Sequence, residues 1–364
     1  MTLLHTRKST RRIMVGDVPV GSGAPVSVQS MTNTFTQDVK ATVSQIRRLE
    51  RAGCEIIRVA VPDMDAAHAI KAIVQKISIP LIADIHFDYR LAIAAAENGA
   101  KGLRINPGNI GADHKIKQVV DCAKDHGVPI RVGVNAGSLE KDLQEKYGPT
   151  ARAMVESALK NVRILEGFGF DQVKMSLKAS DVERTVDACR LFSQESDVPL
   201  HLGVTEAGGI FAGITKSAIG IGMLLAEGIG DTFRVSLTRD PVEEVRTGYE
   251  ILRALSIRHR GPEIISCPTC GRCGIDLFAV AEQVENALLE STVPIKIAIM
   301  GCVVNGPGEA KEADIGLAGG DGKGILFRKG KVIRKVDQQD LVSELLKEVE
   351  TYKMNSEAVN GEKS

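Results

Sequence analysis

Short apolar runs alternate with longer amphipathic segments between residues 25 and 255. The runs are rich in β-branched residues, and the segments repeat apolar residues at three- and four-residue spacing, as helices with one buried face do. Such alternation is typical of βαβ units that build a parallel sheet. The predicted strands are Pro25–Met31, Glu55–Val61, Leu81–His86, Gly102–Asn106, Pro129–Asn135, Gln172–Lys178, Leu200–Glu206 and Asp231–Thr238. The predicted helices include Val39–Ala52, Ala66–Ile77, Tyr89–Asn98, Ala151–Gly167, Asp181–Glu195 and Val242–Leu255.

Eight β/α units within about 230 residues fit a closed (β/α)8 TIM-type barrel better than an open doubly wound sheet. The 364 residues exceed the ~250–300 at which one core stops growing. We therefore predict an α/β protein with a barrel over residues 1–256, a smaller α+β domain over 262–353 and a disordered polar tail over 354–364. The smaller domain is expected to contain a helix near Phe278–Leu289, a strand at Ile295–Met300, a hairpin in Ile325–Val336 turning at Lys329–Gly330, and a helix at Asp340–Tyr352.

The composition is that of an ordinary globular protein, with 43% hydrophobic and 25% charged residues. Because 46 basic side chains balance 46 acidic ones, we expect neither a nucleic acid nor a membrane surface as partner. The N-terminal segment MTLLHTRKSTRR lacks the apolar stretch of a secretory signal, and no run approaches the ~18 apolar residues of a membrane span. The expected location is the cytoplasm.

Polar side chains gather near the carboxyl ends of the predicted strands, where barrel enzymes place their binding groups. Within several strands these residues share parity, so side-chain alternation puts them on one face, which in a barrel strand is the lumen. Buried cations repel one another, and a di- or polyphosphate would neutralise them. The alternative is that nearby carboxylates pair with them. The candidate binding residues are Arg58, Arg104, Asn106, Arg131, Asn135, Lys174, Ser176, Lys178 and Ser236.

Three residues at the same strand ends are candidates for acid–base catalysis. Glu206 enters the Gly-rich turn Ala207–Gly209, which places a carboxylate at the barrel mouth. Asp84 and His86 lie on one face of their strand and could transfer protons in the same way. A single histidine on a strand is as often a packed residue as a catalytic one. This alternative stays open for both His86 and His201.

Four cysteines lie between Cys267 and Cys302, which points to a metal. Cys267, Cys270 and Cys273 are spaced as two overlapping Cys-x-x-Cys units, and Cys302 adds a distant thiol. Structural zinc commonly takes paired Cys-x-x-Cys units or histidines, and the second pair is missing here. A Cys-x2-Cys-x2-Cys run with one remote thiol is instead typical of a [4Fe–4S] cluster. The fourth iron could be held by Cys273 or by an oxygen of Glu309, and the spacing does not choose between them.

Several long motifs resemble one known family. They are Ser266–Arg272 (SCPTCGR), Ile299–Glu309 (IMGCVVNGPGE), Arg104–Asn109 (RINPGN), His201–Gly208 (HLGVTEAG) and Arg234–Thr238 (RVSLT). By these segments the chain resembles the 4-hydroxy-3-methylbut-2-enyl diphosphate synthases, and the resemblance covers nearly the whole chain. Members of that family reduce 2-C-methyl-D-erythritol 2,4-cyclodiphosphate, opening its ring and expelling water, in the non-mevalonate isoprenoid pathway.

The resemblance also implies roles for particular residues and partners. It implies cluster ligation by Cys267, Cys270, Cys302 and Glu309, an acid–base role for Glu206, and contacts from the basic lumen to a cyclic diphosphate. It implies a homodimer and an electron donor that is reduced flavodoxin or ferredoxin. The first rival interpretation is a zinc-stapled barrel transferase that acts on a diphosphorylated substrate without redox chemistry. The second is a non-enzymatic iron–sulfur carrier in which all four thiols bind the cluster and the barrel is structural.

Overall fold

The computed structural model describes residues 4–302, 310–320 and 322–361. The chain divides into two compact units, Met1–Arg258 and His259–Ser364. Among the described residues, no helix is long and apolar enough to cross a membrane.

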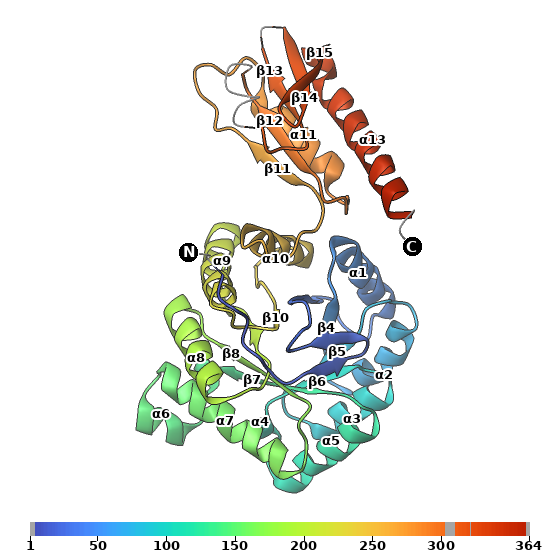
Figure 1. The fold of residues 1–364 in the computed structure, drawn as a ribbon. Helices are drawn as coiled ribbons and strands as arrows, with labels where there is room; N and C mark the ends of the chain where they lie inside the picture. The colour runs from blue at the N-terminus through green and yellow to red at the C-terminus, as the bar shows by residue number, and fades with distance from the viewer. Residues whose placement is uncertain (1–3, 303–309, 321, 362–364) are drawn as a thin grey trace. The chain divides into compact units, whose positions relative to one another are not determined.

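The first unit is a (β/α)8 barrel, as predicted (Figure 1). Its parallel strands are adjacent in the order β8-β7-β6-β5-β4-β3-β10-β9, and a bridge from Met175 to Leu200 joins the two ends of the sheet. Every predicted strand is present, although β9 and β10 are short. The strands are β3 (Ser27–Met31), β4 (Ile56–Ala60), β5 (Leu81–Asp84), β6 (Gly102–Ile105), β7 (Ile130–Asn135), β8 (Val173–Lys178), β9 (His201–Leu202) and β10 (Thr232–Phe233).

Helices cover the outside of the barrel, and several begin at side chains that cap them. Asp38, Asp63 and Asp181 each accept a hydrogen bond from a backbone N–H in the first turn of the following helix, which satisfies donors that lack an intrahelical partner. The helices are α1 (Val39–Ala52), α2 (Met64–Val74), α3 (Tyr89–Glu97), α4 (Pro107–Ile110), α5 (Asp113–Asp125), η1 (Ala136–Ser138), α6 (Lys141–Tyr147), α7 (Ala151–Gly167), α8 (Val182–Glu195), α9 (Ile210–Ala226) and α10 (Pro241–Ala254).

A hairpin that the sequence analysis did not predict closes the amino-terminal end of the barrel. Strands β1 (Ile13–Val15) and β2 (Val18–Val20) pair antiparallel. Their apolar side chains form a separate buried cluster with Ile56 and Ile82 of the barrel strands. Apolar contacts of the hairpin therefore cover the amino-terminal end of the barrel.

The second unit is a five-stranded mixed sheet in the order β11-β12-β13-β14-β15. The first three strands run parallel, and β14 and β15 continue antiparallel with a hairpin turn at Lys329–Gly330, as predicted. Side chains of both long helices form one core with the sheet. The elements are β11 (Glu263–Ser266), α11 (Leu277–Leu288), β12 (Lys296–Met300), β13 (Ile315–Gly319), β14 (Lys323–Arg328), β15 (Lys331–Asp337), η2 (Gln338–Asp340) and α13 (Leu341–Gly361).

The last helix is longer than the sequence pattern predicted. Helix α13 continues to Gly361, whereas we predicted a helix end at Tyr352. The polar composition after that residue suggested a break, but residues 353–360 include neither proline nor glycine. Without such a breaker, the helical hydrogen bonding of the preceding turns can propagate. Disorder of the tail over 354–364 stays a prediction.

Candidate functional site

The inward-facing side chains of the barrel stack in layers, each supplied by every second strand. Extending the strand register along the barrel gives a mouth layer of Ala60, Asn106, Lys178 and Ser236. Below it lie Met31, Asp84, Gly133 and Gly203. The next layer, here called the basic layer, is Arg58, Arg104, Ser176 and Arg234. Beneath that are an inner layer of Gln29, Ile82, Arg131 and His201, and a floor layer of Ile56, Gly102, Lys174 and Thr232.

Asp84 holds two arginines of the basic layer. Its carboxylate oxygens lie 3.1 Å from Nη1 of Arg104 and 3.5 Å from Nε of Arg58. Burial opposes ionisation, but the charges of Arg58, Arg104 and Arg131 outweigh it and lower the pKa of Asp84. A carboxylate that stays ionised is a poor proton donor. We therefore interpret Asp84 as the counter-ion that orients Arg58 and Arg104, and this geometry adds no support to the acid–base role predicted for it.

Three other basic groups of the lumen have no such partner among the described residues. Arg131, Lys174 and Lys178 are all less than a tenth exposed, and no carboxylate of the described residues lies within ion-pair distance of them. Arg131 donates one hydrogen bond, to Oγ of Ser176 at 2.8 Å. Acids of the described residues therefore do not neutralise the whole cationic set. A lumen of this kind suits a polyanion.

Burial has electrostatic consequences for these groups. Burial, followed by the charge of Arg131, lowers the pKa of Lys174 to about 7. The same two causes lower the pKa of Lys178 well below its ordinary value. Burial also lowers the pKa of Arg58 to about 10, although Asp84 opposes this change. An anion bound among these groups would favour their charged forms and raise the pKa values again.

Two partners in the site were missed by the sequence analysis. Glu244, on the first turn of α10, is 2% exposed and binds the Arg234 guanidinium through both oxygens, at 2.9 and 3.0 Å. It also accepts hydrogen bonds from the Ser30 hydroxyl and the Leu237 backbone N–H. Arg234 shares parity with Ser236, so the alternation rule could have found it. Glu244 has no such signal, because it reaches the site from a helix.

Two glycines make room for the charged side chains. A Cβ on Gly133 would lie 2.9 Å from Nη2 of Arg104, and a Cβ on Gly203 would lie 2.6 Å from Nζ of Lys178. Gly203 also has a φ of 151°, which is strained for any other residue. Side chains at these positions would therefore compete for the space that the cations occupy.

We expect Gly133→Ala to raise the KM for the substrate about 10–100-fold, because a guanidinium displaced by about 1 Å no longer meets its anion. The free energy of unfolding should change little, since the flexible end of Arg104 can move. Gly137→Ala is the matched control, because a Cβ there has no neighbour within 4 Å. Steady-state kinetics and denaturant unfolding measure the two quantities. An unchanged KM in Gly133→Ala would remove Arg104 from the binding site.

The remaining candidates lie around the mouth. Glu206 is exposed and has a φ of 52°, a conformation that few residues other than glycine adopt. His86 is exposed, and its ring nitrogens lie 3.2 and 3.4 Å from Nη1 of Arg104. Asn106 accepts a hydrogen bond from the Gly108 N–H at 3.0 Å. Asn135 and Ser236 are half-buried.

His201 lies deeper than the mouth residues. It is fully buried, and its Nδ1 is 2.7 Å from Oγ1 of Thr232. Burial, followed by the charges of Lys178 and Arg131, lowers the pKa of His201 well below its ordinary value. The imidazole is therefore neutral, and its Nε2 has no hydrogen-bond partner among the described residues.

In the second unit, cysteines lie on loops that follow neighbouring strands. Cys267 comes directly after β11 and Cys302 shortly after β12, and these strands pair in parallel. The Gly301 N–H donates to Sγ of Cys267 at 3.3 Å. The thiol of Cys273 donates to the Ile275 carbonyl at 3.2 Å, and its sulfur lies 2.5 Å from the place of a Cβ on Gly301. Gly301 thus lies against both cysteine sulfurs.

The predicted ligand set is only partly visible. Glu309 lies outside the described residues. Cys270 is exposed on the turn between Cys267 and Cys273. Among the side chains that the structure describes, no three of His, Cys, Asp or Glu lie close enough to hold a metal ion. The donor chemistry fits an iron–sulfur group even so, because soft thiolates that accept backbone hydrogen bonds are its usual ligands.

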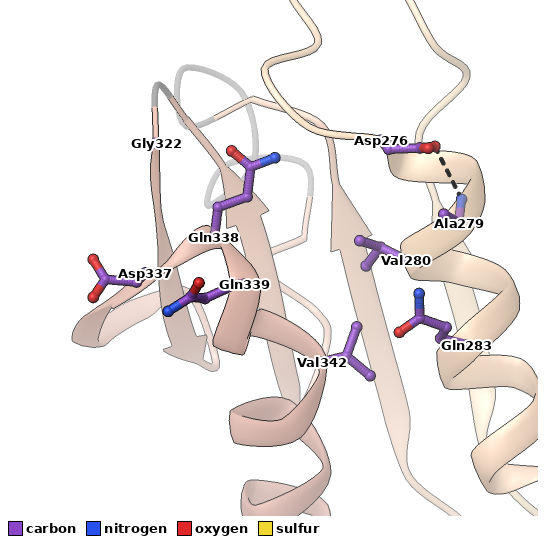
Figure 2. A pocket seen from close by; sticks show the side chains of 9 residues that line it. All are labelled: Asp276, Ala279, Val280, Gln283, Gly322, Asp337, Gln338, Gln339 and Val342. Atoms are coloured by element: carbon purple, nitrogen blue, oxygen red, sulfur yellow. Dashed lines mark hydrogen bonds between the residues drawn. The ribbon is translucent and has the colours of Figure 1, made fainter.

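A separate hollow of about 610 Å³ lies in the second unit, between the start of α11 and the η2–α13 junction (Figure 2). Asp276 accepts a hydrogen bond from the Ala279 N–H at its edge, at 3.1 Å. The described lining of the hollow includes the neutral amides of Gln283, Gln338 and Gln339 and the carboxylate of Asp337. This described lining contains neither Lys nor Arg. This hollow therefore does not offer the cations that a diphosphate needs.

Fold and site together define a barrel enzyme with a cationic lumen and a second unit that carries clustered cysteines. Residues 10–249 match the GcpE TIM-barrel domain, and residues 263–351 match the GcpE protein C-terminal domain. The chain belongs to the GcpE family and is an oxidoreductase.

Individual proteins agree with this assignment. A 4-hydroxy-3-methylbut-2-en-1-yl diphosphate synthase (flavodoxin) of Desulfotalea psychrophila is 62% identical over 348 residues, which cover 94% of this chain and 96% of that protein. The enzyme of the same name from Geobacter sulfurreducens is 61% identical over 345 residues, with coverage of 94% and 98%. A dihydropteroate synthase structure from Stenotrophomonas maltophilia shares the barrel fold alone, with a TM-score of 0.51, 15% identity, and coverage of 68% of this chain and 98% of that one.

Proposed function

We propose that the chain is a 4-hydroxy-3-methylbut-2-enyl diphosphate synthase that reduces 2-C-methyl-D-erythritol 2,4-cyclodiphosphate in the non-mevalonate isoprenoid pathway. The reaction takes two electrons and one proton, opens the cyclic diphosphate at a carbon–oxygen bond and releases water. The bridging oxygen stays on phosphorus, so the product diphosphate carries one more negative charge than the substrate. A zinc-stapled transferase is not favoured, because the family is one of oxidoreductases.

The observation that carries this proposal is the buried excess of positive charge in the lumen. Arg131, Lys174 and Lys178 lie beyond ion-pair distance of every described carboxylate. A positive charge on any of these groups at such depth, without a counter-ion, costs several kcal/mol, so the arrangement serves a ligand that supplies the missing negative charge. A small cyclic diphosphate supplies two phosphoryl groups within a compact volume.

Each predicted binding residue has a role in this scheme. The guanidinium groups of Arg58, Arg104 and Arg131, together with the ammonium of Lys178, hold the phosphoryl oxygens. Lys174 supports them from the floor layer. Asp84 fixes the angle of two guanidinium groups through its ion pairs. Hydrogen bonds from the wall and the mouth come from Asn106, Asn135, Ser176 and Ser236.

Glu206 is the proposed acid–base residue, with His86 as the second candidate. The exposed carboxylate of Glu206 lies at the mouth, and the backbone of this residue has a positive φ. Such strain persists only where the surrounding structure imposes it, and it is concentrated at functional sites. A protonated Glu206 could give its proton to the departing hydroxyl and so complete the release of water.

Cys267, Cys270, Cys302 and Glu309 are the proposed ligands of a [4Fe–4S] cluster. When bound, the cluster would pass single electrons to the substrate. The Gly301 N–H already donates to the Cys267 sulfur, and such hydrogen bonds stabilise a thiolate. One carboxylate among three thiolates would leave one iron less firmly held than four thiolates would. The proposed electron donor is reduced flavodoxin, with ferredoxin as the alternative.

A homodimer is part of the proposal, in which the second unit of one chain covers the barrel mouth of the other and excludes water. Three phenylalanines stand exposed on loops or helix starts that follow barrel strands: Phe35 at 81%, Phe87 at 72% and Phe211 at 88%. Large aromatic side chains exposed on one rim are typical of protein interfaces. The rim therefore supports a partner surface around the mouth.

Replacing Phe35 and Phe211 together with serine is expected to raise the dimer dissociation constant at least about 100-fold, because each buried aromatic anchor contributes about 2 kcal/mol or more. Analytical ultracentrifugation measures this constant. Met14→Ser is the matched control, because Met14 is 42% exposed on the hairpin at the other end of the barrel. Equal dissociation constants in the two variants would place the interface elsewhere.

The direct test is conversion of the cyclodiphosphate by protein purified without oxygen. With reduced flavodoxin, the expected product is 4-hydroxy-3-methylbut-2-enyl diphosphate, detected by mass spectrometry. Metal analysis of the same sample should give about four irons with matching sulfide per chain. Zinc without sulfide, and no reduction of the substrate, would overturn the proposal and restore the transferase.

A further inference from the structure

The floor of the lumen contains an amine that no described group of the protein satisfies. Lys174 is 2% exposed, and its Nζ has no hydrogen-bond partner among the described residues. In the strand register it stands beside Arg131, which is 3% exposed and has an equally unpartnered Nε and Nη2. Two such neighbours repel each other when both are charged.

The other polar groups around the floor are cationic or neutral. Arg58 is a cation, and Lys178 of the same strand as Lys174 is another basic group. Gln29 of β3 is neutral. His201 of β9 is held as a neutral imidazole at Thr232. None of these groups supplies the negative charge that would hold a proton on Lys174.

The acids of the lumen are engaged by other residues. Glu244 is bound to Arg234 of β10, and Asp84 is bound to Arg58 and Arg104. Both pairs lie in layers above the floor. No carboxylate of the described lumen is therefore available to Lys174.

Asp231 is an acid whose charge acts on Lys174, and its oxygens already accept hydrogen bonds from other groups. Arg7 and Thr10 donate to Oδ1 at 2.7 and 3.1 Å, and the Leu200 N–H donates to Oδ2 at 2.9 Å. These partners hold Asp231 toward the amino-terminal end of the barrel. Burial and the charge of Arg131 together lower the pKa of Lys174 to about 7, with Asp231 opposing them only in part.

We propose that Lys174 is a charge-matching residue that takes up a proton from solvent when a diphosphate occupies the basic and inner layers above it. Without a ligand its amine is largely neutral at pH 8, which relieves repulsion with Arg131. When phosphoryl oxygens neutralise Arg131, the cost of a second positive charge falls, and the protonated fraction of Lys174 rises. It is a positioning residue, because it acts through Arg131.

This inference rests on the proposed function, and it explains why the site would contain a group that can change its charge. Opening of the ring adds one negative charge to the bound diphosphate. A permanently charged residue could match only one of the two states, whereas the protonated fraction of Lys174 can rise further from substrate to product as the ligand charge grows. The lumen thereby stays close to the charge of its ligand from substrate to product.

The test is titration calorimetry of the anaerobically purified full chain with inorganic pyrophosphate at pH 8, in two buffers of different ionisation enthalpy. The difference between buffers gives the protons taken up per pyrophosphate bound. Wild-type protein should take up about 0.5–1 proton more than Lys174→Met. The difference between the two proteins cancels the proton balance of pyrophosphate itself.

Two further variants keep the test decisive. Lys174→Arg is permanently charged, so pyrophosphate should bind without the extra proton even if the methionine variant binds too weakly to measure. His201→Gln removes another titratable group near Arg131 and should retain the wild-type uptake, while Lys178 is present in every variant and cancels in the comparison. Equal proton uptake in wild type and Lys174→Arg, or its loss only in His201→Gln, would overturn the inference. Because pyrophosphate binding needs no electron transfer, this result is independent of the conversion assay.

Discussion

Replacing Arg131 with methionine is expected to raise the KM for the cyclodiphosphate about 100-fold or more. The guanidinium is 3% exposed and has two nitrogens without a partner among the described residues, so a phosphoryl group is the natural acceptor. Truncating one member of a buried charge pair costs about 2–5 kcal/mol, and about 1.4 kcal/mol corresponds to a factor of ten. Steady-state kinetics with reduced flavodoxin measures the change.

The same substitution should make the protein without ligand more stable, by about 1–4 kcal/mol in the free energy of unfolding. Burial, followed by the charges of Arg58 and Arg104, lowers the pKa of Arg131 well below its ordinary value. A basic group whose folded-state pKa lies below its unfolded one opposes folding at neutral pH, and the opposition fades only as the pH rises toward the unfolded value. Methionine fills similar space without the charge, and Ser176 keeps a contact to the Val132 carbonyl at 3.4 Å.

Arg234→Met is the matched control, because Arg234 occupies the neighbouring basic layer but has a partner. Its loss would leave Glu244 buried at 2% exposure without its bidentate cation. Breaking such a pair should destabilise the protein by about 3–5 kcal/mol. Denaturant unfolding of both variants checks the contrast. If Arg131→Met lowers the free energy of unfolding as much as Arg234→Met does, then Arg131 stabilises the fold, and its burial is not explained by a ligand.

The barrel and the cationic lumen could be predicted because both follow from periodic patterns. Alternation along each strand assigned Arg104, Arg131 and Lys174 to one face, and the structure places all three inside the barrel. The rule needs only the local strand geometry. It does not tell how residues of different strands compare in depth, because that depends on the register between strands. The position of Arg131 one layer below Arg58 and Arg104 therefore came from the structure alone.

Other features depend on contacts between distant segments and have no local signal. The hairpin β1–β2 seals the lumen through apolar contacts with Ile56 and Ile82, which belong to strands far along the chain. Glu244 reaches Arg234 from a helix that otherwise covers the outside of the sheet. Gln29 shares parity with Met31, but a single uncharged polar residue on a strand does not indicate a binding site. Its unpartnered amide became visible only in the packed lumen.

The cysteine loops show the opposite case, in which the sequence is more informative than the structure. The spacing and the family resemblance name four ligands, whereas Glu309 lies outside the described residues. Thiolates converge when a metal draws them together. The arrangement around Gly301 therefore gives neighbours for Cys267 and Cys273 without selecting the fourth ligand.

Substitution of single cysteines should identify the ligands of the cluster. The largest losses of bound iron are expected at Cys267 and Cys302. In Cys302→Ala we expect iron to fall from about four to below about one per chain in protein purified without oxygen, and cyclodiphosphate reduction to fall to background. The physical reason is that loss of one of three thiolates removes a corner of the site, and the remaining ligands cannot hold the group by themselves.

Cys273→Ala is the matched control and is expected to keep its iron and its visible absorption. The Cys273 thiol is already engaged by the Ile275 carbonyl within its own turn, and the proposed fourth ligand is Glu309. Glu309→Ala should therefore weaken one iron, giving protein with fewer than about four irons but an intact set of thiolates. Loss of iron in Cys273→Ala together with full retention in Glu309→Ala would reverse the assignment. The site would then hold four thiolates, a set suited to electron transfer, and substrate activation would fall to the barrel residues alone.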